Sequence, residues 1–424
     1  MTTTRFPSLP FAFKKVPLSL FYLLLAVFPT QLGKHLWLES SLVHGLRLDY
    51  LSLTIYLTDS ILISFLLTFV VVYRKKLVAT FLGVPVKQKK LLCLFLIFLL
   101  AQAFWVPFPV QHTVFTLRLF LLGLFALSVG IVPWEKRVVF FVFCIQLLGI
   151  AALTILQMYH QKSLGGWLYW LGERRFSILT PGIALETIAD RMLLRPYATF
   201  SHPNVLAGYV TIILFHLYTL APKVKNLLFY TAIFAGVFTV TISFSQGSWL
   251  AVGITLCVLF LKRVKTSSLK MVVTLSLLVP FLSFALPLEM GESIGVRNLL
   301  FKTYLHLSLS RLLLGLGWFG HFSNLGVERL VLLGKYWLQP PHHSWWLLIF
   351  ALGIIPTTLL VLSLGRVVFK KISLIPIARL APLVAIVILG TVDHYFITQP
   401  QTLYLLFFTL GYVFATREKN YCEL

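Results

Sequence analysis

Arginine, histidine and aspartate residues recur at the ends of long apolar segments in this 424-residue chain. An ionised group inside a bilayer costs about 2.5–3.5 kcal/mol on insertion scales, so polar residues at such positions carry information. A guanidinium offers a fixed fork of donors that matches phosphate oxygens. A histidine with a pKa near neutrality can take a proton from a hydroxyl group. The candidate site residues are Arg118, Arg191, Arg195, His202, Asn204, Arg297, His342, His343, Asp393 and His394.

The basic candidates also have structural interpretations. Arg195 and Arg297 are the first candidates for binding an anion, but each can instead form a salt bridge or extend toward lipid headgroups. Arg118, inside an apolar segment, either lines a cavity or reaches the headgroups. His342 and His343 precede the apolar segment 344–363, as a catalytic base or as an interfacial pair.

The remaining candidates stand beside predicted helix ends. His202 and Asn204 flank Pro203, a residue that suits the first turn of a helix, so both can be capping residues or can contact substrate. Asp393 can orient the neighbouring His394, or both can belong to a solvated loop.

Metal chemistry has little support in the sequence. The 13 acidic residues form no His-Glu-x-x-His or Asp-x-Asp pattern, and the four cysteines have no metal-ligand spacing. We therefore predict no metal and no cofactor. The inventory favours a reaction in which arginines hold a phosphate group.

The composition indicates which elements position these residues. The chain is 58% hydrophobic and 12% charged, with a mean hydropathy of +0.90, whereas soluble domains are near 45–50% and about 25%. Runs of about 20 apolar residues predict membrane-spanning helices. We predict an all-α polytopic membrane protein with a single membrane domain over residues 1–424. About twelve helices are expected, near 16–33, 56–73, 91–107, 113–132, 138–156, 203–220, 227–244, 248–261, 271–287, 344–363, 376–392 and 401–415.

The net charge of +23 reports on sidedness. With the N-terminus inside, the inside segments hold 23 Lys and Arg and 3 acidic residues, whereas the outside segments hold 12 and 10. This bias is the positive-inside pattern, so we predict cytosolic termini and no nucleic-acid partner. We expect the first apolar segment to be an uncleaved span, because no small-residue cleavage pattern follows it.

Two long segments, 157–202 and 288–343, then lie on the outer face. In the first, Thr180–Pro181 predicts the start of a surface helix that ends before Pro196. In the second, Ser293 predicts a helix cap, and a helix carrying Arg297 follows. The glycine-rich stretch 314–320 favours a turn or close packing over phosphate binding.

Four stretches in order resemble the O-antigen ligase and polymerase family over about residues 190–411. They are 195–208 with Thr-Phe-Ser-His-Pro-Asn, 243–251 with Ser-Gln-Gly, 297–322 ending in Gly-Leu-Gly-Trp-Phe-Gly-His-Phe, and 341–353 with His-His-Ser-Trp-Trp. Asp393-His-Tyr fits the closing segment. Gln246 replaces the usual arginine, Ala198 replaces glycine, and His343 replaces asparagine.

The resemblance implies a GT-C-like membrane glycosyltransferase without metal. Such enzymes move a glycan from a polyprenyl (undecaprenyl) pyrophosphate carrier to a hydroxyl of lipid A core or of another surface glycan, as in lipopolysaccharide or other cell-envelope polysaccharide biosynthesis. The expected place is the outer face of the bacterial cytoplasmic membrane. The resemblance covers both ligases and polymerases. A transporter of anions or glycans is the alternative from another class.

The resemblance also implies roles for the candidates. Arg195 and Arg297 would hold the pyrophosphate, and His342, which the alignment favours over His343, would be the general base of an inverting reaction. The other candidates would contact substrate, with Arg118 assisting at the phosphate. The expected partners are a lipid-linked glycan donor, a glycan or glycolipid acceptor, and membrane lipid.

Overall fold

The computed structural model describes residues 11–43, 45–221, 226–260, 292–309, 311–323, 331–332, 335–336, 338–372 and 374–415. The predicted apolar segments within these ranges form helices, because a helix pairs its own backbone groups where water is absent. The helices are α1 (Phe11–Ala26), α2 (Leu57–Leu82), α3 (Val86–Gln102), α4 (Pro109–Ile131), α5 (Lys136–His160), α6 (Pro203–Leu220), α7 (Leu227–Ile242), α8 (Gln246–Phe260), α10 (Glu292–Leu309), α11 (Ser344–Leu352), α12 (Ile354–Ile372), α13 (Ile377–Val392), α14 (Tyr395–Thr398) and α15 (Pro400–Phe414).

Short strands and 3-10 turns occupy the connections. The strands are β1 (Gly33–Leu36), β2 (Leu42–Val43), β3 (Leu46–Arg47), β4 (Leu53–Tyr56), β5 (Leu185–Ile188), β6 (Arg191–Leu194), β7 (Val331–Leu332) and β8 (Lys335–Tyr336). The 3-10 turns are η1 (Glu39–Ser41), η2 (Asp49–Leu51), η3 (Gly166–Leu171) and η5 (Gly320–Phe322). Each strand pairs antiparallel with one other, in the order β1–β4, β2–β3, β5–β6 and β7–β8.

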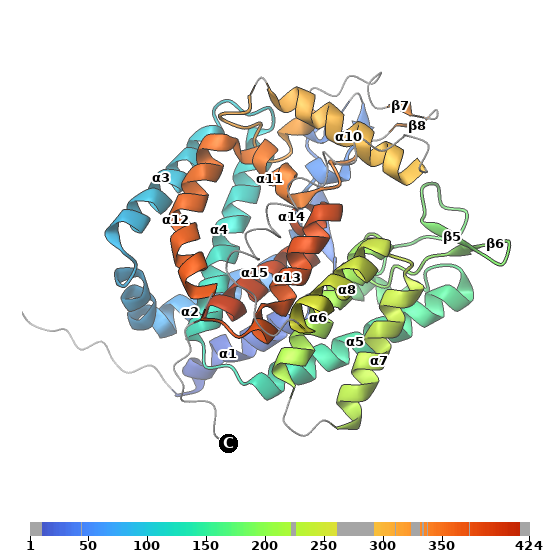
Figure 1. Cartoon of the computed structure of the whole chain (residues 1–424), viewed down its shortest axis with the longest axis horizontal. Coiled ribbons are helices and arrows are strands. Elements are labelled where there is room, and N and C mark those ends of the chain that lie inside the picture. Colours follow the sequence, from blue (N-terminus) through green and yellow to red (C-terminus); the bar gives the residue numbers. More distant parts are fainter. Residues whose placement is uncertain are drawn as a thin grey trace, which may run out of the picture.

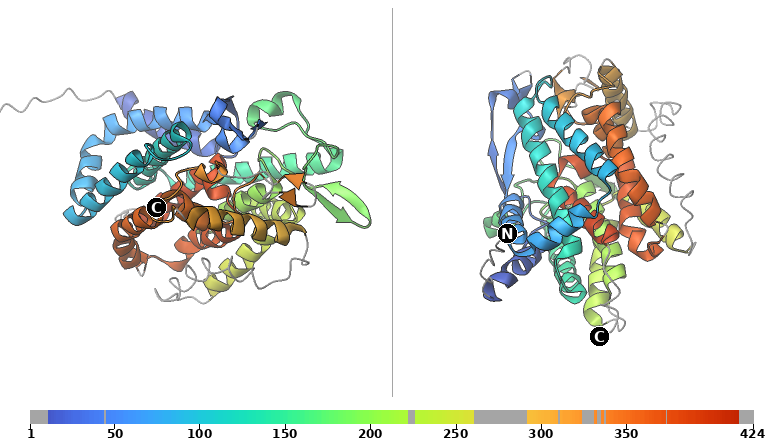
Figure 2. Two further views of the ribbon diagram at one scale, coloured as in Figure 1. Left: turned by 90° about the horizontal axis from the view of Figure 1, so that it is seen from above. Right: turned by 90° about the vertical axis from the view of Figure 1, so that its left-hand side faces the viewer.

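The helices form one bundle, with segments distant in sequence side by side (Figure 1). α4 packs on α15, α3 packs on α12, and α13 lies between α6 and α8. Aromatic side chains fill the centre, where the Phe21 ring lies 5.9 Å from Phe65 and 6.2 Å from Phe125. α10 lies across one end of the bundle (Figure 1), and in the right-hand view of Figure 2 the blue β1–β4 hairpin runs along the opposite edge.

The number of helices that can cross a membrane is smaller than the twelve predicted. In the described part of the chain, three helices are long and apolar enough, Pro109–Ile131, Lys136–His160 and Pro203–Leu220. A fourth is counted if the pair Ser344–Leu352 and Ile354–Ser363, bent by 111°, is one span. Most predicted positions within the described residues are helical, although 16–33 is helical only as far as Ala26. Five further apolar helices are 10–17 residues long, below the roughly 20 that a span needs. The predicted span 271–287 lies outside the described residues.

The bend after α11 is built on glycines, as the stretch 314–320 predicted. Gly315 and Gly353 both have positive φ values, of 72° and 83°, which glycine adopts without strain. The Leu316 and Gly317 amides donate to the carbonyls of Phe350 and Ala351, both at 2.9 Å. This contact therefore holds the C-terminal end of α11 against residues 316–317, in the connection that follows α10.

The surface helix predicted after Thr180–Pro181 is wrong. Residues 185–194 form the β5–β6 hairpin, with Glu186 opposite Leu193. Ala189 and Asp190 at its tip have φ values of 46° and 60°, as in the two-residue turns that match the twist of a hairpin. The apolar spacing there fitted a helix, but the turn fixes the segment as two strands. By contrast, the helix expected there is α10, but it begins at Glu292, so Ser293 lies inside its first turn and is not the cap that was predicted.

Candidate active site

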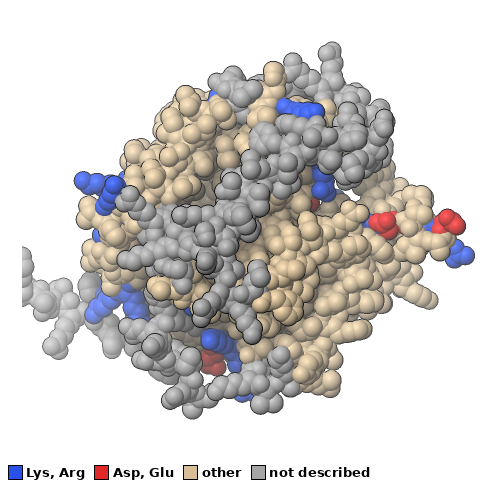
Figure 3. All heavy atoms as spheres, in the orientation of Figure 1, with Lys and Arg blue, Asp and Glu red and all other residues tan. Residues whose placement is uncertain are grey.

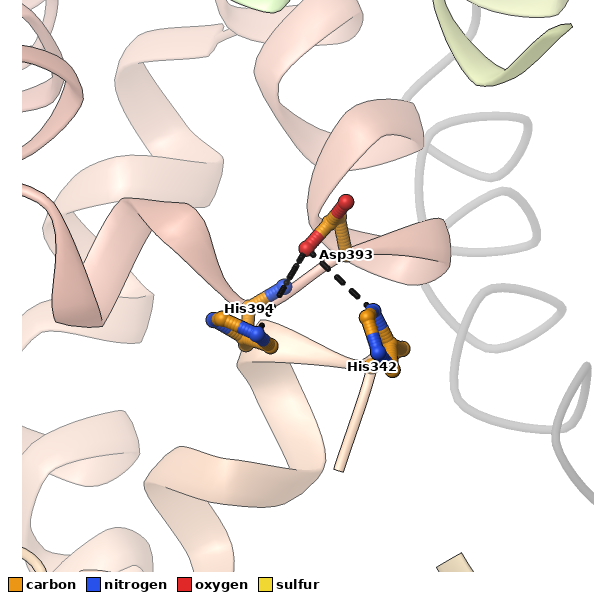
Figure 4. A group of neighbouring side chains, drawn as sticks. All are labelled: His342, Asp393 and His394. Carbon is orange, nitrogen blue, oxygen red and sulfur yellow. Dashed lines mark hydrogen bonds and ion pairs between the residues drawn. The ribbon is translucent and has the colours of Figure 1, made fainter. Parts of the chain in front are cut away.

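Three predicted residues converge at one point between the ends of α11, α13 and α14. The His342 Nδ1 atom lies 3.5 Å from Asp393 Oδ1, and the His394 Nε2 atom lies 3.9 Å from the same oxygen. Figure 4 shows the Asp393 carboxylate between the two imidazole rings. The cluster joins residues about 50 positions apart in the sequence, so only the tertiary fold creates it.

Backbone contacts fix the position of Asp393. Its carbonyl accepts from the Ser344 amide at 3.0 Å and from the Ser344 hydroxyl at 2.8 Å, which ties the end of α13 to the start of α11. Its Oδ1 atom accepts from the His394 amide at 2.7 Å. The Asn204 side chain, at the start of α6, approaches Oδ2 at 3.5 Å. Three helix ends therefore meet at this carboxylate.

Charges around the cluster set its protonation. Burial raises the pKa of the Asp393 carboxyl, but the hydrogen bond and charge of His342 and the charge of Arg297 outweigh burial and lower it below its usual range. Burial lowers the pKa of His394 to about 3. Burial and the Arg195 charge lower the pKa of His202 to about 4. Near neutral pH, Asp393 is therefore ionised and the imidazoles of His202 and His394 are neutral.

The cluster opens into a cavity of about 460 Å³. Its walls come from the β1–β4 hairpin, η2, α4, the η3 turn and the starts of α6 and α15. Of the predicted site residues, those that line it are Arg118, His202, Asn204, His342, Asp393 and His394. A cavity of this size, with convergent polar groups, is the usual form of a small-ligand site.

Arg195 lies beside the cavity and supports one of its walls. Its Nη2 donates to Asn204 Oδ1 at 2.8 Å, and its Nε donates to the Ser243 carbonyl at 2.8 Å. Burial lowers the pKa of the guanidinium, while Glu186 acts in the opposite direction. Arg195 therefore orients Asn204 toward Asp393, a contact that the sequence did not predict.

Arg297, on α10, is half-buried. It also does not line the cavity, yet its charge acts on Asp393, His202 and His394. It lies near enough to the cluster to supply positive charge there. The prediction that Arg195 and Arg297 contact a pyrophosphate stays a prediction.

Arg118 lines the opposite wall and is already paired. Its guanidinium bonds both carboxylate oxygens of Asp59, at 3.1 and 2.7 Å, and donates to the Thr54 carbonyl at 2.6 Å. The Tyr404 hydroxyl donates to Asp59 at 2.8 Å. Of the two alternatives for Arg118, the structure supports the first: the side chain faces a cavity, and a buried carboxylate neutralises its charge.

Two predicted substrate contacts lie elsewhere. Arg191 is exposed on β6 and does not line the cavity. His343 is buried and caps α11, accepting from the Trp346 amide at 3.3 Å through Nδ1. This cap turns the His343 ring into the helix end, and His342 faces the cavity instead. Of the two histidines, His342 is thus the one placed to contact a ligand in the cavity, and its role as a base stays a prediction.

The cavity also contains residues that the sequence analysis missed. Arg174 lines it and donates to the Ser201 carbonyl at 3.1 Å. Gln339 and Thr398 bond the outward nitrogens of His342 and His394, at 3.2 and 2.8 Å. Tyr50 stands edge-on to His394 with ring centroids 5.8 Å apart. Polar residues of short loops give no periodic signal, so only proximity to a predicted site residue in sequence could have suggested them.

The four stretches that carried the family resemblance meet around this cluster. Arg195 bonds Ser243, which joins the first stretch to the second. Gly317 bonds Ala351, which joins the third to the fourth. A Cβ at Gly247, in the second stretch, would stand 2.8 Å from a methyl of Val392, the residue before Asp393. Segments spread over about 200 residues therefore pack into one region.

The cluster can also be considered as a metal site. The ligand atoms of His342, Asp393 and His394 all lie within 4.8 Å of one another. Two imidazole nitrogens and a carboxylate oxygen are suitable ligands for a divalent transition metal. The described residues thus offer two uses for the same atoms, holding a proton or holding a cation.

Comparison with known proteins adds no further evidence about function, because no protein-family model and no curated protein matches this chain.

Proposed function

We propose that this chain is a membrane glycosyltransferase of the O-antigen ligase or polymerase type. It would transfer a glycan from a polyprenyl pyrophosphate carrier to a hydroxyl group of an acceptor glycan or glycolipid. The membrane character of the chain rests on its apolar helices. The outer face of a bacterial cytoplasmic membrane, twelve spans and the GT-C-like arrangement belong to the proposal.

One observation supports this function best: the stretches that resemble the family come together at a histidine–aspartate pair in a polar cavity. His342 and Asp393 come from different stretches, and both line the cavity. His202 and Asn204, from the Thr-Phe-Ser-His-Pro-Asn stretch, line the same cavity. A set of loose motifs that merely caps helices would have no reason to converge on one base.

The proposed proton transfer uses the pair directly. His342 Nδ1 faces Asp393, and Nε2 contacts the side-chain oxygen of Gln339, which lines the cavity. When the acceptor hydroxyl replaces Gln339 at Nε2, the ring carries its proton on Nδ1 toward Asp393 and the Nε2 lone pair is free. The acceptor oxygen attacks the anomeric carbon, the bond from that carbon to the pyrophosphate oxygen breaks, and the hydroxyl proton passes to Nε2. Asp393 stabilises the imidazolium that forms. Attack opposite the leaving group inverts the anomeric centre.

The reaction also requires that the negative charge on the departing pyrophosphate be stabilised. Arg297 acts electrostatically on the cluster, and Arg174 lines the cavity. Arg195 keeps Asn204 in place through its Nη2. Preorganised donors of this kind stabilise developing charge without a metal ion, because they cost no reorganisation during the reaction.

Reconstitution in liposomes tests the proposal. Purified protein receives a polyprenyl-pyrophosphate-linked oligosaccharide and an acceptor glycolipid extract, with a chelator present, and free polyprenyl pyrophosphate and glycan size are followed. Release with one new adduct indicates a ligase, and release with a ladder indicates a polymerase. Absence of release with every acceptor, together with passage of an anion or a glycan across the bilayer, would replace the proposal with a transporter.

Variants assign the roles. We expect His342→Ala to lower product formation by at least a hundredfold, and Arg297→Ala and Arg195→Ala to lower it at least tenfold. His343→Asn is the matched control, because asparagine keeps a helix-capping side chain while removing the adjacent imidazole. Full activity in the three alanine variants, with normal insertion, would disprove this assignment.

A further inference from the structure

We infer that His342, Asp393 and His394 form a binding site for a divalent transition metal, with Zn²⁺ as the best-matched ion. The three coordinating atoms would be His342 Nδ1, Asp393 Oδ1 and His394 Nε2, which point toward one another in Figure 4. No pattern of spacing in the sequence signals the site, since two ligands are adjacent and the third is about 50 residues away.

The hydrogen bonds behind the ligands support the assignment. His394 Nδ1 bonds the Thr398 hydroxyl at 2.8 Å, so Nε2 is left facing the carboxylate. His342 Nε2 bonds the Gln339 side-chain oxygen at 3.2 Å, so Nδ1 is left facing the Asp393 carboxylate as well. Histidines that ligate metals characteristically donate their other ring nitrogen to an outer partner, which fixes the tautomer and the ring orientation.

The distances suit a small cation. Bonds of about 2.1 Å in a tetrahedral site place ligand atoms roughly 3.4 Å apart. The two nitrogens lie 3.5 and 3.9 Å from the shared oxygen. In the absence of a cation, His394 Nε2 directs a lone pair at an anionic oxygen, and the contact of His342 Nδ1 with the same oxygen is long, at 3.5 Å. A cation between the three atoms satisfies all of them together.

The cavity offers a bound cation an open coordination position and two further carboxylates. All three ligands line the cavity, so a fourth position opens toward a water or a ligand there, as in metal sites with three protein ligands. Asp49 and Glu173 line the same cavity. Of the positive charges nearby, Arg118 is neutralised by Asp59, whereas Arg174 in the lining and Arg297 on α10 act against a bound cation.

The site has a consequence for activity that rests on the proposed function. A metal at His342 Nδ1 uses the lone pair of that nitrogen, so the single proton of the neutral ring moves to Nε2 and none is released to solvent. His342 has no free lone pair in that state, so it cannot accept the hydroxyl proton. Bound Zn²⁺ would therefore inhibit transfer, and removing it would restore transfer.

Direct metal binding tests the site without any activity. The full-length protein in detergent is stripped with a chelator, equilibrated with Zn²⁺ and measured for bound metal, and Co²⁺ is added separately to record the absorption bands of a low-symmetry site. We expect one Zn²⁺ per chain, bound at least tenfold more weakly in His394→Gln and in Asp393→Asn. His343→Asn, which removes the neighbouring imidazole, should bind within twofold of the parent.

The outcomes separate this site from the proposed function. Absence of stoichiometric Zn²⁺, or equal binding in the parent and in both His394→Gln and Asp393→Asn, overturns the metal site whatever the activity. If Asp393→Asn fails to fold, His394→Gln alone decides. Stoichiometric binding without glycan transfer keeps the site and rejects the transferase. Where transfer is observed, Zn²⁺ should inhibit it with the same midpoint as binding, and stimulation would overturn the inhibitory role.

Discussion

Arg118 was predicted as a site residue from the sequence, but its buried ion pair with Asp59 was not. Its side chain retains 18% of its exposure and that of Asp59 retains 12%. Asp59 also binds the Tyr56 amide at 3.0 Å and the Tyr404 hydroxyl at 2.8 Å. Removing one partner of such a pair leaves an uncompensated charge, which costs more than the pair contributes as a whole.

We therefore predict that the Arg118–Asp59 pair acts mainly through stability. Asp59→Asn should lower the free energy of unfolding by about 3 kcal/mol, because it leaves the guanidinium without a counter-charge. The double variant Asp59→Asn with Arg118→Met should lose less than the sum of the single variants, with a coupling of about 1–3 kcal/mol. Thermal unfolding in detergent measures both quantities. Additive losses, together with a raised donor KM in Arg118→Met alone, would instead assign Arg118 to substrate binding.

At the scale of elements, a backbone contact between two glycine turns positions the reactive end of α11. A Cβ at Gly315 would overlap the carbonyl oxygen of Ala351 and the backbone of Leu352. These atoms belong to rigid backbone at the end of α11, so they cannot move aside as a flexible side chain would. The contact carries the segment 341–353, and with it His342, to the cavity.

We predict that Gly315→Ala is much more destabilising than Gly182→Ala. Both glycines have positive φ, 72° and 74°, so each substitution pays about 1–2 kcal/mol for the left-handed conformation. At Gly182 nothing lies within 4 Å of a new Cβ, whereas at Gly315 the overlap adds a further cost. Melting temperatures of the two variants make the comparison. Equal shifts would show that the turn near Gly315 relaxes freely.

The same elements show how far the sequence could predict the structure. Runs of apolar residues located the helices because burial and internal backbone pairing act over each segment as a whole. The β5–β6 hairpin was missed because Leu185, Ile188 and Met192 satisfy helical spacing, while the decisive feature is the positive φ of Ala189 and Asp190. Helix spacing does not encode that turn.

The site was predictable only in part, for a related reason. Residues at helix ends, such as His202 and Asp393, stood out because charge and polarity are conspicuous beside apolar segments. Their partners did not, because contacts such as Asn204 with Arg195 and His394 with Thr398 depend on how helix ends meet. The Arg118–Asp59 pair likewise joins residues 59 positions apart.

At the scale of the whole molecule, charged side chains are sparse on the one face that Figure 3 shows. In Figure 3 the Lys and Arg side chains on the visible face form small separate groups among uncharged residues, with the acidic groups few. The exposed surface includes many large apolar side chains, among them Phe104, Leu67 and Phe234. Dispersed basic groups on an apolar surface suit headgroups at a membrane boundary better than a nucleic-acid groove.

The sidedness predicted from the charge bias of the sequence can be tested on the intact cell. Lys87, in the basic segment 74–90, and Lys162, between α5 and η3, are both exposed. Because positive-inside charge favours a cytosolic location for the first and an outer location for the second, a cysteine at Lys162 should react with a membrane-impermeant maleimide. A cysteine at Lys87 should react only after permeabilisation. Each cysteine is introduced separately into a variant in which the four native cysteines have been replaced. Labelling of Lys87→Cys alone would place the cavity of His342 on the cytosolic side, where the proposed donor would face the wrong compartment.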